Sequence, residues 1–205
     1  MFIEQPPFIL RRIWRARWRL PRNPKCVYLT FDDGPCPDTT PRLLDILDSY
    51  GVKATFFCVG DNVRKHPALF EELLRRGHAV GNHTMHHLRG FNYTVREYMK
   101  DVDAADSLIR SPLFRPPYGR ISLRQLRQLK RRFTVIMWDV ITRDYNAKLS
   151  PEKVTSIVRR YSRNGSIIVF HDSLKASKNM FRAIGPSIEW LREQGYEFRT
   201  LRDAT

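Results

Sequence analysis

A chain of 205 residues with 42% hydrophobic and 28% charged residues is long enough for one domain with a substantial core, and this composition excludes a disordered or fibrous protein. The net charge of +15 favours anionic partners such as acidic lipid headgroups, nucleic acid or acidic glycans. Three cysteines without paired spacing argue against a disulfide framework and against a cysteine metal site, so we expect reduced thiols at Cys26, Cys36 and Cys58.

Residues 1–25 form a basic segment that differs from the domain predicted over residues 26–205. Its apolar residues recur at helical spacing, at Leu10, Ile13, Trp14 and Trp18. Arginines take most other positions, which predicts an amphipathic helix over residues 8–20. Such a helix can lie on an anionic membrane surface, or it can pack its apolar stripe on the domain and close one end of it. We do not expect nucleic acid to be the partner.

The sequence has no stretch that is apolar and long enough to span a membrane. Its N-terminus also lacks the apolar core and cleavage site of a secretory signal. We therefore expect a cytoplasmic protein, peripheral to the inner face of the membrane if the basic segment binds lipid.

Apolar runs and helical patterns alternate from Cys26 onward. Strands are predicted over residues 26–29, 54–59, 78–82, 114–116, 133–138, 166–170 and 196–201. Helices are predicted over residues 41–50, 67–76, 94–109, 122–131, 150–163 and 179–194. Continuous apolar strands between long helices indicate an α/β fold with a parallel sheet covered on both faces. About seven such units in this length favour a single-domain, closed or nearly closed (β/α) barrel.

Ionisable residues recur where the predicted strands end, and in a parallel barrel all these ends lie on one face. These residues are Asp32 and Asp33, His83 to His87, Arg115, Asp139 and Asp144, and His171 and Asp172. Because adjacent carboxylates repel, either Asp32 or Asp33 needs a metal, an arginine or a proton as partner.

His83 and His87 are four residues apart, so one helical turn would point both imidazoles the same way. With an aspartate from a neighbouring strand they predict a metal site of two histidines and one carboxylate, which leaves room for water and substrate. His86 would point elsewhere, as a supporting or surface residue. His66 and His78 are expected to be structural.

Four segments, in order, resemble the motifs of the polysaccharide deacetylases (the NodB-like domain, carbohydrate esterase family four). They are TFDDGP (30–35), HTMHH (83–87), RPPYG (115–119) and VFHD (169–172). The resemblance covers about residues 25–201. It implies a distorted (β/α) barrel of about seven strands and the hydrolytic removal of acetyl groups from an N-acetylated amino sugar or polysaccharide.

The resemblance also implies roles for the residues of these motifs. Asp33, His83 and His87 would bind one divalent metal, commonly zinc, with cobalt or nickel as alternatives. Asp32 would be the general base that takes a proton from the attacking water.

Four further residues receive roles from the same resemblance. His171 would protonate the leaving amine, and a nearby carboxylate would help to keep it charged. The backbone N–H of Tyr118 would stabilise the oxyanion. Arg115 would hold Asp32, and Asp144 would orient Arg115. Asp172 is expected to cap the loop that follows it.

Three positions depart from the family pattern. Ile141 stands where the family has an aspartate, Tyr145 where it has a second tryptophan, and Val169 where it often has a leucine beside the acetyl methyl group. We expect these changes to alter the pocket around the acetyl group.

Two alternatives stay open beside N-deacetylation. One is an O-deacetylase that acts on an acetylated sugar ester. The other is a catalytically idle domain that binds an anionic glycan or membrane. A lipid-linked glycan intermediate would fit the basic N-terminal segment as a substrate.

Overall fold

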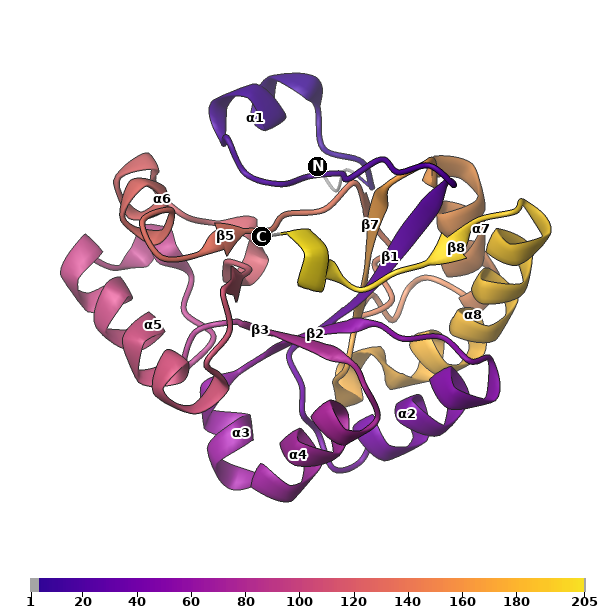
Figure 1. Ribbon diagram of the computed structural model, residues 1–205, viewed down its shortest axis with the longest axis horizontal. Helices are drawn as coiled ribbons and strands as arrows, with labels where there is room; N and C mark the ends of the chain where they lie inside the picture. The colour runs from indigo at the N-terminus through magenta and orange to yellow at the C-terminus, as the bar shows by residue number, and fades with distance from the viewer. Residues whose placement is uncertain (1–3, 205) are drawn as a thin grey trace.

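A curled sheet of parallel strands forms the centre of the molecule in the computed structural model, which describes residues 4–204 (Figure 1). The strands are β1 (Cys26–Asp32), β2 (Thr55–Cys58), β3 (Ala79–Asn82), β4 (Leu113–Phe114), β5 (Thr134–Val135), β6 (Val140–Ile141), β7 (Ser166–His171) and β8 (Glu197–Phe198). Their order is β5-β4-β3-β2-β1-β7-β6, and β8 pairs with the first residues of β1. This partial barrel confirms the predicted α/β architecture.

Helices α2 to α8 surround the sheet, and α1 projects away from it (Figure 1). The helices are α1 (Phe8–Ile13), α2 (Thr40–Ser49), α3 (Gly60–Lys65), α4 (Pro67–Arg75), α5 (Val95–Ile109), α6 (Leu123–Leu129), α7 (Pro151–Tyr161) and α8 (Leu174–Glu193). Short 3-10 turns lie at Gly90–Asn92, Pro117–Gly119 and Leu201–Ala204. The sequence did not predict α3 and β6, because such short elements give too little periodicity, and α8 begins before the predicted residue 179. None of these helices has the length and apolar character needed to cross a bilayer.

The side chains of β1 alternate between the outer core, under the helices, and the interior of the barrel. All seven residues of β1 are buried, and successive side chains point to opposite faces of the sheet. Phe31 faces the outer core, where its ring stacks at 5.1 Å on that of Phe56. Tyr28 faces the interior with Phe57. Asp32, an even number of residues further along, therefore also faces the interior, at the carboxyl end of the strand.

The N-terminal segment is not the long helix that its pattern predicts. The helix α1 ends at Ile13, and the chain from Trp14 to Leu20 is not helical but makes isolated bridges at Arg17 and Arg19. The Arg17 N–H donates to the Val135 carbonyl at 2.8 Å, and Arg17 pairs with Ile136 beyond β5. The helix does not continue here, because the unpaired edge of β5 offers hydrogen-bond partners to the backbone of Arg17.

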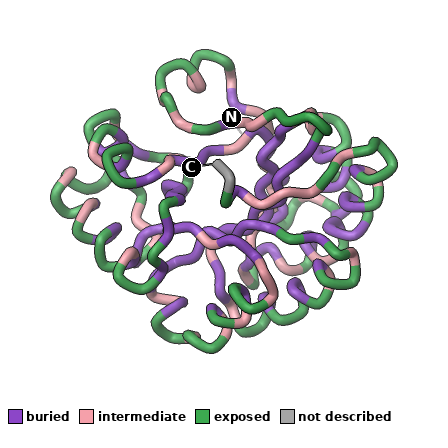
Figure 2. Tube along the Cα trace, in the orientation of Figure 1, coloured by how far each residue is buried: buried purple, intermediate pink, exposed green. Residues whose placement is uncertain are grey.

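Residues 14–20 instead span the gap between β5 and β7. The Trp18 side chain is 8% exposed and meets Trp138 edge-on, with 6.2 Å between ring centroids. The Trp14 indole N–H donates to the Ile121 carbonyl at 3.1 Å. The Leu20 N–H donates to the Gly165 carbonyl at 2.8 Å, just before β7. These contacts agree with the alternative in which the segment closes part of the domain, while α1 itself stays exposed (Figure 2).

Candidate active site

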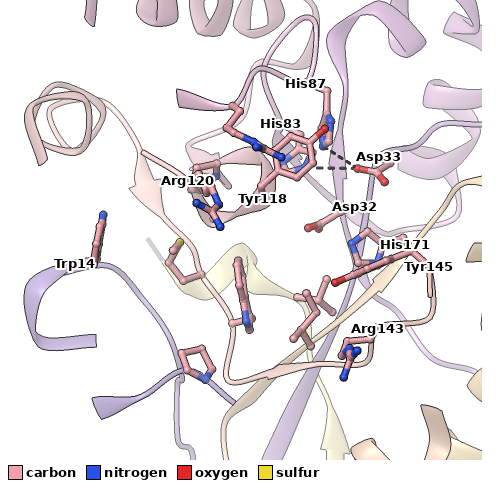
Figure 3. A pocket seen from close by; sticks show the side chains of 18 of the residues that line it. Trp14, Asp32, Asp33, His83, His87, Tyr118, Arg120, Arg143, Tyr145 and His171 are labelled. Atoms are coloured by element: carbon pink, nitrogen blue, oxygen red, sulfur yellow. Dashed lines mark ion pairs between the residues drawn. The ribbon is translucent and has the colours of Figure 1, made fainter. Parts of the chain in front are cut away.

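Three side chains converge at the carboxyl ends of β1 and β3. Ligand atoms of Asp33, His83 and His87 all lie within 4.8 Å of one another. Asp33 Oδ1 lies 3.1 Å from His87 Nε2 and 3.7 Å from His83 Nε2 (Figure 3). The structure therefore brings together the two imidazoles and the carboxylate that the sequence singles out, close enough for one divalent ion to bridge them.

Hydrogen bonding and burial prepare these groups to ligate. His83 Nδ1 lies 2.7 Å from the Arg115 carbonyl oxygen, so Nδ1 carries the proton and Nε2 keeps a free lone pair towards Asp33. Burial lowers the pKa of His83 to about 4 and keeps its ring neutral. Burial alone would raise the pKa of Asp33, but the hydrogen bond from His87 and the nearby histidines outweigh it and hold that pKa well below its usual range.

The loop that carries the two histidines is not the helical turn on which the sequence argument relied. Thr84 and His87 have left-handed backbone conformations, with φ of 66° and 54°. Asp101 of α5 shapes the loop, because its Oδ2 accepts from the N–H groups of Met85 and His86 at 2.8 and 3.1 Å. The two imidazole centroids still lie 5.0 Å apart. His86 points away and pairs with Asp101, as a supporting residue should.

Asp32 lies beside these groups but has an arginine as its partner. Arg115 Nη1 donates to Asp32 Oδ1 at 2.6 Å and to Thr30 Oγ1 at 2.7 Å, and Nη2 donates to the Met137 carbonyl at 3.0 Å. The guanidinium is fully buried, 4.1 Å above the ring of Phe57. The geometry therefore agrees with the role that the resemblance gives Arg115, which is to hold Asp32.

Asp144 binds His171 and not Arg115, so the assignment of Asp144 to Arg115 is wrong. Asp144 Oδ1 lies 2.7 Å from His171 Nδ1, and Oδ2 accepts from the His171 N–H at 2.8 Å. The reason is strand pairing: Ile141 of β6 is in register with Val169 of β7, which carries residue 144 alongside the end of β7. Burial alone would lower the pKa of His171, but the buried Asp144 carboxylate raises it to about 9.

Asp172 faces back to the first motif and does not cap the loop that follows it. Its carboxylate accepts from Thr39 Oγ1 at 2.6 Å and Thr40 Oγ1 at 2.5 Å, at the start of α2. Its N–H donates to the Asp32 carbonyl at 2.7 Å. A Cβ on Gly34 would lie 2.3 Å from Asp172 Oδ2, so only glycine fits there. Asp172 thus ties the loop after β1 to the end of β7, and burial raises its pKa to about 6.

A cavity of about 720 Å³ opens over these residues. Tyr118, with φ of 58° in a tight turn, places its ring 4.6 Å from that of His87. On the other side, the ring of Tyr145 meets His171 edge-on at 4.8 Å. Ile141 and Val169 also line the cavity, so all three departures from the family pattern lie where substrate would bind.

The N-terminal segment lines the same cavity, which the sequence analysis missed. The lining residues it contributes are Pro6, Pro7, Leu10, Trp14 and Trp18. In Figure 3, Trp14 stands across the cleft from Asp33. The one available signal was the pair of tryptophans, because such large apolar surfaces are seldom left in water.

Asp139 lies at a strand end but serves the fold. Its buried carboxylate is 2.8 Å from Arg11 Nη2 and 2.7 Å from Arg163 Nη2, and it accepts from Ser166 Oγ at 2.8 Å. These contacts fasten α1 to β7. His78 is structural as predicted: it is buried and accepts from the Ala54 N–H at 3.1 Å. The three cysteines are free thiols, also as predicted.

Comparison with known proteins identifies the family of the chain. A family model described as polysaccharide deacetylase matches residues 19–136. A peptidoglycan-N-acetylglucosamine deacetylase of Bacillus cereus is 32% identical over 194 residues, which are 91% of this chain and 91% of that protein. The peptidoglycan-N-acetylmuramic acid deacetylase PdaC of Bacillus subtilis is 34% identical over 185 residues, which cover 87% of this chain and 38% of that longer protein.

A solved structure is similar over nearly the whole chain. The Bc1960 peptidoglycan N-acetylglucosamine deacetylase superposes with a TM-score of 0.89 at 30% identity, covering 97% of this chain and 96% of the other. The similarity therefore covers the arrangement of nearly the whole chain.

Proposed function

The chain belongs to the polysaccharide deacetylase family, and on that premise we propose that it is a metal-dependent hydrolase that removes acetyl groups from an N-acetylated amino sugar of a glycan. Its relatives include peptidoglycan N-acetylglucosamine and N-acetylmuramic acid deacetylases and chitooligosaccharide deacetylases. The observation that carries the proposal is the placement of Asp32, held by Arg115, beside the convergent Asp33, His83 and His87.

The donor set fits a divalent metal. Two imidazole nitrogens and a carboxylate suit zinc, with cobalt or nickel as alternatives. Asp33, His83 and His87 would hold the ion, which would act as a Lewis acid on water and on the substrate carbonyl. The bond between His83 Nδ1 and the Arg115 carbonyl fixes the ring for this purpose.

Asp32 is the general base in this proposal. Its Oδ1 is occupied by Arg115, so the carboxylate is positioned without being a ligand. It takes a proton from the water that attacks the carbonyl carbon of the acetamide. The charge that develops on the carbonyl oxygen can be met by the N–H of Tyr118, which makes no hydrogen bond within residues 4–204.

His171 is the general acid. When the C–N bond breaks, the amine nitrogen needs a proton, and the imidazolium of His171 supplies it while acetate leaves. Asp144 supports this role because it fixes the ring at Nδ1 and raises the pKa of His171 to about 9. A protonated acid that is positioned in this way favours an amide substrate over an ester, whose leaving alkoxide needs less help.

Mass spectrometry on a panel of N- and O-acetylated sugars and oligosaccharides tests the proposal. We expect loss of acetyl from N-acetylated glycans, reduced about 10²- to 10⁴-fold in Asp32→Asn. His171→Ala should reduce N-deacetylation much more than O-deacetylation. Equal turnover by wild type and Asp32→Asn, or no loss of acetyl from any sugar, would contradict the proposal.

A further inference from the structure

One wall of the cleft ends in a cation stacked on an aromatic ring. The ring of Tyr118 contacts that of His87, and the Arg89 guanidinium lies 4.7 Å from the Tyr118 centroid. Tyr118 is 54% exposed and lines the cavity. The ring of Tyr118 therefore lies between Arg89 and His87, one of the three candidate metal ligands.

The other wall repeats this arrangement with different elements. The ring of Tyr145 contacts His171, and Lys175 Nζ, near the start of α8, lies 5.7 Å from the Tyr145 centroid. Figure 3 shows Tyr118 and Tyr145 on either side of Asp32. A cation thus stands beyond a tyrosine on each side of the reacting position.

Outside the candidate catalytic residues, the unpaired charges that line the cleft in the described part of the chain are positive. Within residues 4–204, the only carboxylates that line it are Asp32 and Asp33, which belong to the site itself. Arg89, Arg120 and Lys175 line the cavity, are exposed, and form no ion pair with a carboxylate in that part of the chain. Charges of one sign along a cleft with low-dielectric walls raise the local concentration of oppositely charged ligands.

We propose that the cleft binds a glycan that carries an anionic group, a carboxylate or a phosphate, on the sugars that flank the one losing its acetyl group. The inference rests on the proposed function and extends it to the substrate class. Tyr118 and Tyr145 line the cavity, where their exposed ring atoms can contact the flanking sugars. Arg89 and Lys175 then meet the anionic groups, and the guanidinium can bind a carboxylate or phosphate through two parallel hydrogen bonds.

Matched tetrasaccharides test this proposal. The first alternates N-acetylglucosamine and N-acetylmuramic acid with free lactyl carboxylates, and the second carries the same carboxyls as neutral methyl amides. The third is an N-acetylglucosamine tetrasaccharide with 6-phosphates on the flanking sugars. For wild type we expect kcat/KM on the carboxylate or the phosphate substrate to exceed that on the neutral amide about 25-fold, mainly through KM, because each of two ion pairs contributes about fivefold.

Variants assign the preference to the two cations. Arg89→Gln and Lys175→Gln should each reduce the ratio of anionic to neutral kcat/KM about fivefold, and Arg89→Lys should restore part of it. Arg159→Gln, an equal loss of charge on the exposed surface of α7, should leave the ratio at its wild-type value. Added salt should reduce the preference in wild type more than in the double variant.

Titration calorimetry of the same tetrasaccharides against Asp32→Asn measures binding without turnover. A preference for only the carboxylate or only the phosphate supports the proposal and identifies the group. Equal affinity for all three, or a loss in Arg159→Gln as large as in Arg89→Gln, overturns it. If the anionic preference is measured but no acetyl is lost from any sugar, the proposed function fails and this inference stands.

Discussion

Two regions line the same cleft, and they differ in how closely their contacts involve the candidate catalytic residues. The loops at the carboxyl ends of β1, β3, β4 and β7 are fixed by polar contacts, such as those between Asp32 and Arg115 and between Asp144 and His171. The N-terminal segment packs Trp18 against Trp138, makes a few backbone bonds to the edge of β5, and pairs Arg11 with the buried Asp139, which lies outside the metal cluster. We infer that changes in the loops should affect chemistry first, and changes in the segment should affect stability or surface binding first.

The largest effect is expected at the ligand cluster. Asp33→Ala removes the charged ligand of the set, so divalent metal content of the purified protein should fall to background. Deacetylation should fall about 10³-fold or more, because the ion contributes several kcal/mol to the transition state. Atomic absorption and acetate release measure the two quantities.

His86→Ala is the matched control for Asp33→Ala. His86 is in the same motif, but its imidazole pairs with Asp101 and lies outside the cluster. Metal content should therefore stay near the wild-type value. If Asp33→Ala binds as much metal as wild type under metal-replete conditions, the assignment of this cluster is wrong.

A smaller effect on chemistry is expected from Asp144→Asn. The pKa of His171 lies at about 9, above its ordinary 6.5, because Asp144 stabilises the imidazolium. His171 is therefore protonated below that pKa and loses its proton as the pH rises through it. Without the carboxylate the pKa moves down, so the alkaline fall of the kcat profile should move to lower pH, and kcat should fall about 100-fold above neutral pH.

A double-mutant cycle separates this role from a structural one. In a His171→Ala background, Asp144→Asn should have little further effect on kcat, because its partner is already absent. Full additivity of the two substitutions, or an unchanged alkaline limb in Asp144→Asn, would show that Asp144 does not act through His171.

The sequence predicted the loops well where chemistry is carried by residue type at a strand end. Asp32, Asp33, His83, His87 and His171 all line the cleft because parallel strands direct their carboxyl ends to one face, and the buried Arg115 supports Asp32 from behind. The prediction from sequence was wrong where a side chain has several possible hydrogen-bond partners. The family resemblance assigned Asp144 to Arg115, and the pattern could not correct this because the two-residue strand β6, which sets the position of Asp144, is too short to recognise.

Tertiary contacts that the sequence pattern does not reveal also explain why the helix predicted over residues 8–20 ends at Ile13. Its helical periodicity over residues 8–20 is real, but the edge of β5 and the ring of Trp138 compete for the same residues. Tertiary contacts of this kind override local propensity, and they are invisible until the barrel is known. Only the stretch Phe8–Ile13 keeps the helix, and there the described structure offers its backbone no strand to pair with.

Packing of the segment predicts a loss of stability from Trp18→Ala. The side chain is 8% exposed, so its removal leaves a cavity against Trp138 and should lower the free energy of unfolding by about 3 kcal/mol. Urea unfolding followed by circular dichroism measures it. Arg15→Ala, an exposed neighbour, should change stability by no more than about 0.5 kcal/mol. Equal stability of the two variants would contradict the closing role of the segment.

The smallest effect on stability is expected at α1, where a membrane contact is still a prediction. Phe8, Ile9 and Ile13 are 77%, 64% and 46% exposed, and Arg12 and Arg15 are exposed beside them. Apolar side chains flanked by arginines suit the interface of an anionic bilayer. Deletion of residues 1–20 cannot test this, because it would also remove the Trp18 contact and the pairing of Arg17 with Ile136.

Replacing Phe8, Ile9 and Ile13 by serine keeps the segment and changes only its exposed apolar surface. Each substitution should alter the free energy of unfolding by no more than about 0.5 kcal/mol, since the wild-type side chains are already in water. Co-sedimentation with phosphatidylserine vesicles should fall about tenfold, and neutral phosphatidylcholine vesicles should bind neither protein. If the triple variant sediments with anionic vesicles as wild type does, α1 is not a membrane contact, and its arginines serve only the ion pair between Arg11 and Asp139 and the solubility of the chain.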